Sequence, residues 1–510
     1  MLDVSGLDMP PRFEFWSKLF DKHGFVKREL VRHEHHKGSG CWGWELNQGM
    51  LVYVDVVWVD PPYRRQGVGS LMLRRLLESK HIEPFDFLVA CETPTQDPHS
   101  HDHSSEIRRR HMGFLHRNHF RRLGRTPFLL CSAISNHPSR KRLVLNEPLS
   151  NLEYEDKSDP VDPLELLFPG MRDPDAVSRN AAKYPIHEAI GRILDRDVVY
   201  TPLGEEISIS TFIQQQFVRD PSSLHVRNRK GYTPLHAAAA HKNLTAVQAL
   251  LQPQYKCQAD LSRRDNVEGA TPLEILMLVL QKEREVTESS GKSWWGYPER
   301  PLKVAWTLKR ADGLDIGTLS QFVVKSRWGC TCGHCTSGWF SPLMRRSMAC
   351  FASSLSSKMQ ASKSTMRGHV AQVDLVGLKY LPLRIRNATT LAGYEGFLAV
   401  VRGVEAVCRT ADQIPTPLVV LQASAGLGDI SEYVDLGGRA EYALDIVLHA
   451  AQSLSPLGDG TFGEGTFEDV TEDLEDVLCL PPCENDLEFV LVRRHLRLCD
   501  IAGPHHEHGM

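Results

Sequence analysis

MLVYVDVVWVDPPYRRQGVGSLMLRRLLES, residues 50–79, is the stretch that decides the fold of the first part of the chain. Residues 50–59 are mostly β-branched or aromatic and contain almost no strand breaker, which predicts a strand that is buried over most of its length. Residues 61–70 hold prolines and glycines, and residues 71–79 have the apolar spacing of an amphipathic helix. A strand, a glycine turn and a helix in this order predict an α/β unit.

The turn at residues 64–70 has the chemistry of an anion site. Gly67 and Gly69 let backbone N–H groups approach an oxyanion without interference from a Cβ atom. The helix that follows points its unpaired N–H groups and its positive dipole end at the same place, and Arg64 and Arg65 add charge. These features fit a pyrophosphate. A Rossmann dinucleotide site fits less well, because the turn lacks the third glycine of G-x-G-x-x-G.

Two further strands and a helix are predicted downstream of this turn. FDFLVACE (85–92) and TPFLLCSA (126–133) have the composition of short strands. SSEIRRRHMGF (104–114) predicts a helix that Ser104 or Ser105 can cap. The alternation of strands and helices therefore continues to about residue 133.

The combined motifs, over roughly 90 residues from about 45 to 131, resemble the acetyl-CoA-binding fold of the GNAT acetyltransferases. VDPPYRRQGVGSLMLRRLLES (59–79) is similar to motif A of that family, RRRHMGF (108–114) to the end of its motif B, and TPFLLCS (126–132) to its last strand. The resemblance implies a mixed sheet with flanking helices, acetyl-CoA as cosubstrate, and acetyl transfer to an unidentified amine, either a small molecule or a protein.

The resemblance also implies roles for individual residues. In the family, the end of the central strand binds the pantetheine arm and the following turn binds the pyrophosphate. Together these roles carry onto Trp58, Val59, Arg64, Arg65, Gln66, Gly67, Val68, Gly69 and Ser70.

Catalysis rests on fewer residues. The family often places an acidic residue on the central strand, and Asp55 is the only carboxylate inside that strand, where it shares a face with Tyr53 and Val57. Asp55 is therefore the predicted general base, with a structural or rim carboxylate as the alternative. The tyrosine that usually acts as the acid in this family is replaced by Arg109. A non-catalytic domain is thus the runner-up hypothesis.

GYTPLHAAAAHKNLTAVQALLQ (231–252) has the pattern of two short helices joined by a turn. Thr233 can cap the first helix, Pro234 suits its first turn, and His236 can bond back to the threonine. The alanines that follow allow the two helices to pack closely. The segment resembles an ankyrin repeat.

Two related copies flank this repeat. GATPLEILMLVLQ (269–281) restarts the pattern 38 residues on, from Thr233 to Thr271, with Glu274 in place of the histidine. YPIHEAIGRIL (184–194) is a degenerate copy 49 residues earlier. Ankyrin repeats are typically ~33 residues long, so both intervals imply insertions. Three copies can form a small solenoid, which is predicted to bind a protein partner and to have no chemistry of its own.

Cys330, Cys332 and Cys335 form a C-x-C-x2-C motif with glycines between them. Three thiolates within six residues can bind one structural Zn2+, which requires four ligands in a tetrahedron. The alternative is a group of buried thiols in a glycine-rich turn, and a redox motif is less favoured because no thioredoxin-type helix follows. The candidates for the fourth ligand are Cys350, Cys483, Cys479 and His334.

Composition restricts the function further. The chain of 510 residues is 42% hydrophobic and 24% charged with a net charge of −4, which argues against a general nucleic-acid binder. The longest apolar runs, 51–59 and 273–280, are too short to span a membrane. The first residues do not have the pattern of a signal peptide. A cytoplasmic or nuclear location is therefore expected, with the cysteines as thiols or metal ligands.

The chain is thus predicted to be a multidomain protein with an α/β GNAT fold, a mostly α ankyrin-like solenoid and an α-rich C-terminal region. The whole arrangement resembles fungal-type proteins that join these modules to a C-x-C-x2-C segment. The predicted boundaries are 1–135 for the acetyl-CoA-binding domain, 136–175 for a linker, 176–282 for the ankyrin-like repeats, 283–365 for the Cys-rich segment and loops, and 366–510 for the helical C-terminal region with its acidic stretch.

The predicted function is an acetyl-CoA-dependent N-acetyltransferase with an ankyrin module that binds protein. A non-catalytic ankyrin scaffold with a degenerate GNAT domain is the alternative. Three His-rich pieces (33–36, 99–103 and 505–508) and the acidic stretch 464–486 are predicted to be solvated.

Overall fold

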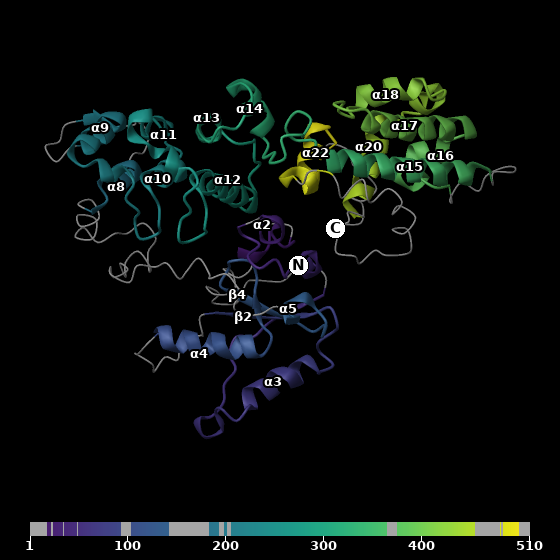
Figure 1. Cartoon of the computed structure of the whole chain (residues 1–510). Coiled ribbons are helices and arrows are strands. Elements are labelled where there is room, and N and C mark those ends of the chain that lie inside the picture. The colour runs from purple at the N-terminus through teal and green to yellow at the C-terminus, as the bar shows by residue number, and fades with distance from the viewer. Residues whose placement is uncertain are drawn as a thin grey trace. The chain divides into compact units, whose positions relative to one another are not determined.

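The computed structural model of the chain divides into two compact units (Figure 1). The first comprises residues 1–292 and 307–314, and the second comprises residues 293–306 and 315–510. The residues that the structure describes are 18–21, 24–33, 35–47, 49–92, 104–141, 183–192, 198–200, 206–364, 375–453, 480 and 483–498. The predicted linker core, two of the His-rich pieces (99–103 and 505–508) and most of the acidic stretch lie outside these residues.

A four-stranded mixed sheet with the order β1-β2-β4-β3 begins the first unit. β1 (Leu51–Tyr53) runs parallel to β2 (Phe87–Cys91), which pairs antiparallel with β4 (Phe128–Ser132). β4 pairs antiparallel with the two-residue strand β3 (Arg121–Arg122). Parallel neighbours need a crossover connection, and α3 (Val68–Leu77) lies in it. The predicted fold class, a mixed sheet with flanking helices followed by helical regions, is confirmed.

The sheet is covered on both faces because successive side chains of a strand point in opposite directions. Phe87 and Val89 of β2 belong to one apolar cluster, to which α2 (Arg28–Arg32) and the residues before β1 contribute. Leu88 and Ala90 belong to another cluster, which contains side chains of α3 and of α4 (Ser104–Arg117). This second face of the sheet therefore packs against α3, the helix in the crossover between β1 and β2.

The described residues upstream of β1 form α2 and the 3-10 helix η1 (Trp44–Asn47), and they contribute no strand to the sheet. One His-rich piece lies here. His35 is half-buried, and burial together with the charge of Arg125 lowers the pKa of His35 to about 4. His35 is thus partly shielded from solvent, in a piece that the sequence predicted to be a solvated loop.

The helical part of the first unit stacks two rows of helices. α8 (Pro185–Arg192) packs on α10 (Pro234–Ala240), which packs on α12 (Pro272–Ser289). In the other row, α9 (Ile209–Arg219) packs on α11 (Leu244–Leu250). A short hairpin of β5 (Val198–Tyr200) and β6 (Glu206–Ser208) precedes α9.

The starts of α10 and α12 are equivalent. The Thr233 and Thr271 side chains each accept a hydrogen bond from the backbone N–H three residues on, and the side chain at that third position, His236 or Glu274, caps the threonine N–H in return. Each helix also has proline at its first position. The two TPL segments thus begin equivalent and adjacent helices, as predicted from the sequence.

A repeated histidine bond joins successive copies of the pattern. His187 Nε2 bonds to the Tyr232 carbonyl at 2.7 Å, and His236 Nε2 bonds to the Ala270 carbonyl at 3.1 Å. Each carbonyl belongs to the residue just before the capping threonine of the next copy. Burial lowers the pKa of both histidines to about 4, so each imidazole is neutral at pH 7 and donates its Nε2–H.

We expect this helical stack to lose stability as pH falls from 7.5 to 5. The two histidines stay neutral in the folded state but bind protons below a pKa of about 6.5 in the unfolded state, so acid favours unfolding. The loss is about 2 kcal/mol for each histidine by pH 5. Hydrogen-exchange protection of the α10 and α11 amides measures it in the full chain. The double variant His187→Gln/His236→Gln is the control, and an equal pH dependence in the two proteins would contradict this origin.

The second unit is built from helices. Seven of its described helices contribute to an apolar core that also includes Trp339 and Phe340: α15 (Pro342–Ser364), α16 (Leu383–Ala388), α17 (Leu391–Arg409), α18 (Pro417–Ala425), α19 (Ser431–Asp435), α20 (Ala440–Ser453) and α22 (Phe489–His495). α14 (Leu319–Ser326) precedes them in the chain, and α13 (Glu299–Ala311) is divided between the two units after Trp306.

α17 is the central helix of this unit and contacts α15, α18, α19 and α20. Close packing depends on small residues along it. A Cβ atom at Gly396 would lie 2.8 Å from Tyr433 Cβ, and one at Gly403 would lie 2.1 Å from Ser424 Oγ. This region is helix-rich, as predicted, and the buried side chains of α17 form much of its core.

No helix among the described residues has the length and apolar character to cross a membrane.

Candidate functional site

β1 separates from β2 directly after their short parallel pairing. The last contact is a hydrogen bond from the Val54 N–H to the Val89 carbonyl at 2.7 Å. Beyond it, Asp55, Val56 and Trp58 are exposed. The predicted strand over 50–59 is therefore wrong past Tyr53, where an extended segment with several exposed residues stands in place of the expected buried strand.

The turn after this segment has a backbone suited to anions. Arg65 and Gly67 have φ angles of 62° and 84°, so both lie in the left-handed region. Gly67 is the N-cap of α3, and no side chain caps the first N–H groups of that helix. A Cβ atom placed on Gly67 would meet nothing within 4 Å. Among the described residues, the N-cap position of α3 is thus open and carries no side-chain cap.

The two glycines of the turn have different roles. A Cβ atom on Gly69 would lie 3.1 Å from Phe114 Cε2 of α4 and 3.6 Å from Val57 Cγ1. Gly69 therefore allows α3 to approach α4, whereas Gly67 supplies the left-handed turn and open space. Both glycines were predicted to bind pyrophosphate, from the chemistry of the turn and from the resemblance to the GNAT family.

Several of the predicted cofactor residues lie together. The Arg64 guanidinium is 5.0 Å from the centre of the Trp58 ring, and its Nε donates to the Val59 carbonyl at 2.8 Å. The Gln66 side chain donates to the Pro62 carbonyl at 2.8 Å. The Val59 carbonyl is thus already bonded to Arg64, and pantetheine binding there would have to share or displace that bond.

α4 places a histidine at the end of β2 that the sequence reasoning missed. His111 Nε2 bonds to the Cys91 carbonyl at 3.0 Å. Cys91 is the last residue of β2, past the point where β1 departs. Burial lowers the pKa of His111, which favours a neutral imidazole. The signal in the sequence was the histidine inside the HMGF motif. Arg109, at the position of the family's tyrosine, is an exposed residue of the same helix.

A buried ion group holds the same end of β2. Glu92 is fully buried, and its carboxylate accepts 2.5 Å hydrogen bonds from Arg108 of α4 and from Arg122 of β3. Arg122 is itself only 3% exposed. The group joins three elements beside Cys91, and sequence spacing gave no indication of it.

Comparisons with known protein families support two of the predicted parts of the chain, the GNAT domain and the ankyrin repeat. Residues 9–96 match the family model described as "Acetyltransferase (GNAT) family", and residues 230–266 match that of "Ankyrin repeat". No curated protein and no solved structure gives a significant match. The chain therefore carries a GNAT acetyltransferase domain and, further along, an ankyrin repeat. The matched GNAT segment includes β1, the turn, α3 and β2, and it ends before α4.

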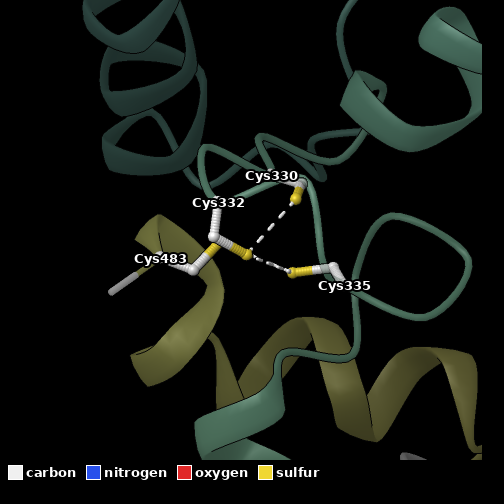
Figure 2. A group of neighbouring side chains, drawn as sticks. All are labelled: Cys330, Cys332, Cys335 and Cys483. Carbon is white, nitrogen blue, oxygen red and sulfur yellow. Dashed lines mark hydrogen bonds between the residues drawn. The ribbon is translucent and has the colours of Figure 1, made fainter. Parts of the chain in front are cut away.

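A separate cluster of four cysteines lies in the second unit (Figure 2). Cys330, Cys332 and Cys335 come from one loop, as predicted, and Cys483 comes from the segment just before α22. Of the other candidates for the fourth position, Cys350 and His334 are not in the group, and Cys479 lies outside the described residues. None of the ten cysteines among the described residues forms a disulfide.

Proposed function

We propose that the N-terminal domain, residues 1–135, is an acetyl-CoA-dependent N-acetyltransferase. The observation that carries the proposal is the separation of β1 from β2 after Val54, directly ahead of the open N-terminus of α3. A pyrophosphate at that helix end would meet unpaired N–H groups and the positive end of the helix dipole. The pantetheine arm would then run along residues 58–59 towards the point where β1 and β2 separate.

The proposed chemistry is attack of an amine on the thioester carbonyl. The C–N bond forms, the C–S bond breaks, and the amine must lose a proton while the CoA thiolate gains one. Asp55 is the proposed base, because it lies exposed where β1 has left the sheet. His111 is a second group for moving a proton at this end of β2. An arginine at position 109 cannot give up a proton at neutral pH, so the thiolate takes its proton from water or leaves as the anion.

We expect Gly67→Val to weaken acetyl-CoA binding at least tenfold. A β-branched residue at a φ of 84° is strained, and its side chain occupies the space that a phosphate would need. Isothermal titration of the full chain measures the change. Gly313→Val is the matched control, because Gly313 has a φ of 85° and equally open surroundings. If Gly67→Val binds acetyl-CoA as tightly as the control, the turn is not the pyrophosphate site.

The second candidate function is a non-catalytic scaffold, which the arginine at position 109 favours. The scaffold hypothesis predicts that the chain releases no thiol from acetyl-CoA in the presence of a broad panel of amines. The enzyme hypothesis predicts amine-dependent thiol release that disappears in Gly67→Val. A thiol-release assay on the full chain separates the two.

We further propose that the stack from α8 to α12 binds a protein partner and holds it near the acetyltransferase. The support is its repeat architecture: equivalent capped helices stacked with a repeated histidine bond. Insertions between copies add loops, and loops of a solenoid commonly carry contacts. Tethering would raise the effective concentration of an acceptor without any new catalytic group. The proposed location is the cytoplasm or nucleus, where thiols stay reduced.

A further inference from the structure

The four cysteines of the second unit have the spacing of a single tetrahedral metal site. The sulfur atoms all lie within 4.8 Å of one another. Three of the separations are 3.8 Å (Cys330 to Cys332), 3.9 Å (Cys332 to Cys335) and 3.4 Å (Cys335 to Cys483). A tetrahedron with Zn–S bonds of about 2.3 Å has S···S edges of about 3.8 Å. The observed edges fit one ion at the centre.

These separations exclude a disulfide in the cluster, because bonded sulfurs lie about 2.05 Å apart. They also fit one ion better than an iron–sulfur cluster, in which inorganic sulfide and a second iron hold some cysteines further apart. A thiolate set without carboxylates is the donor set that Zn2+ takes at closed structural sites.

The surroundings of the sulfurs favour thiolates over plain thiols. The His334 N–H donates to Cys332 Sγ at 3.3 Å, and the Thr331 N–H donates to Cys483 Sγ at 3.4 Å. The Asn485 amide lies 3.7 Å from Cys335 Sγ and also donates to the Gly338 carbonyl. N–H groups aimed at sulfur stabilise negative charge and are the usual support around metal-bound cysteine. Four thiolates at this spacing would repel one another unless a cation lies between them.

The site would join segments that are far apart in the sequence. Cys335 and Cys483 are separated by 148 positions, and both are buried. Just beyond Cys483, α22 packs Phe489, Leu491 and Val492 into the core of the unit. The His495 ring at the end of α22 stacks on the Trp339 ring, with 4.5 Å between the ring centres. Trp339 lies four residues after Cys335 in the chain. A metal at the cluster would fasten α22 to the cysteine loop.

We propose that Cys330, Cys332, Cys335 and Cys483 bind one structural Zn2+ that holds α22 against the core of the second unit. The site is independent of acetyl-CoA. Its role is to fix the fold, because four protein ligands leave no open position for a substrate.

The first test is the metal content of the full chain, purified without added metal. We expect about one equivalent of zinc in the wild type, and close to none in Cys483→Ser or Cys335→Ser. Cys350→Ser is the matched control: it removes a cysteine of the same unit that is not in the group, and it should keep its zinc. Wild type without zinc, wild type with iron in its place, or Cys483→Ser with a full equivalent would each overturn the proposal.

The second test reports the coordination geometry of the metal site, and its outcome does not depend on the yield of purified protein. Co2+ added to the chelator-treated full chain should give the intense visible absorption of tetrahedral cobalt thiolate, and Zn2+ should bleach it. Limited proteolysis should then cut within 483–498 faster in Cys483→Ser than in wild type or Cys350→Ser. An absorption spectrum of octahedral cobalt, or cutting near α22 that is unchanged by loss of the metal, would contradict the proposed role.

Discussion

Glu92→Ala is expected to destabilise the first unit by about 3–5 kcal/mol. The carboxylate is fully buried and accepts hydrogen bonds from two guanidinium groups, one of which, on Arg122, is 3% exposed. Truncation to alanine leaves that cation buried beside an empty volume where the Glu92 carboxylate was. Breaking a buried pair from one side costs far more than the pair contributes by itself, because the remaining charge has lost its solvation.

The measurement is denaturant unfolding of the full chain, followed by a signal local to the sheet such as hydrogen exchange of β2 and β4. Glu78→Ala is the control, because Glu78 pairs with Arg75 on the surface of α3 with both side chains at least half exposed. That pair should contribute no more than about 1 kcal/mol. The double variant Glu92→Ala/Arg122→Leu should recover much of the stability, since it removes the more deeply buried of the two cations together with the carboxylate. Equal losses in Glu92→Ala and Glu78→Ala would show that the buried group does not hold the sheet.

The ion group also bears on the proposed activity. Glu92 follows Cys91, whose carbonyl His111 binds, so the same few residues fix the end of β2 and the histidine on α4. Loss of Glu92 should therefore affect both stability and turnover. The milder Glu92→Gln keeps a hydrogen-bond acceptor at this position and is expected to fall between the two extremes.

The sequence predicted the elements that local chemistry decides. The turn at 64–70 needs left-handed backbone and small residues, and this requirement is visible as Gly67 and Gly69. The capping threonines of α10 and α12 act on their own first turns, so the motif predicted where both helices begin. In each case the interacting groups lie within a few residues of one another.

Predictions from the sequence were wrong or incomplete where residues far apart in the chain determine the local structure. β-branched residues at 54–59 favour a strand, but a strand also needs a neighbour, and β2 stops accompanying β1 after Val54. β3 has two arginines and no apolar pattern, and it exists only because β4 pairs with it. Cys483 was one of four candidates for the fourth position of the cysteine group, and only the folded chain brings it to the loop.

Asp55→Asn is expected to lower the rate of acetyl transfer by about 10²–10⁴-fold, the usual effect of removing a general base. The carboxylate is exposed on the segment that has left the sheet, where an amine from solution can reach it. Asparagine has nearly the same shape but cannot accept the proton. The assay is thiol release from acetyl-CoA by the full chain, with small primary amines and short lysine-containing peptides as acceptors. Glu83→Gln removes an exposed carboxylate that lies outside β1 and the turn; it is the control and should keep the wild-type rate.

The pH profiles of two variants decide between Asp55 and His111 as the group that takes the proton. Either base must be unprotonated to accept a proton, so activity falls with pH in both cases. Burial lowers the pKa of His111, so the acidic limb of a His111 base would lie at a lower pH than that of an exposed histidine. If Asp55 is the base, Asp55→Asn removes the acidic limb and His111→Gln leaves it in place. If Asp55→Asn has an unchanged rate and an unchanged pH profile, Asp55 is not part of the mechanism. If His111→Gln then loses the acidic limb of the profile, the histidine on α4 is the group that takes the proton.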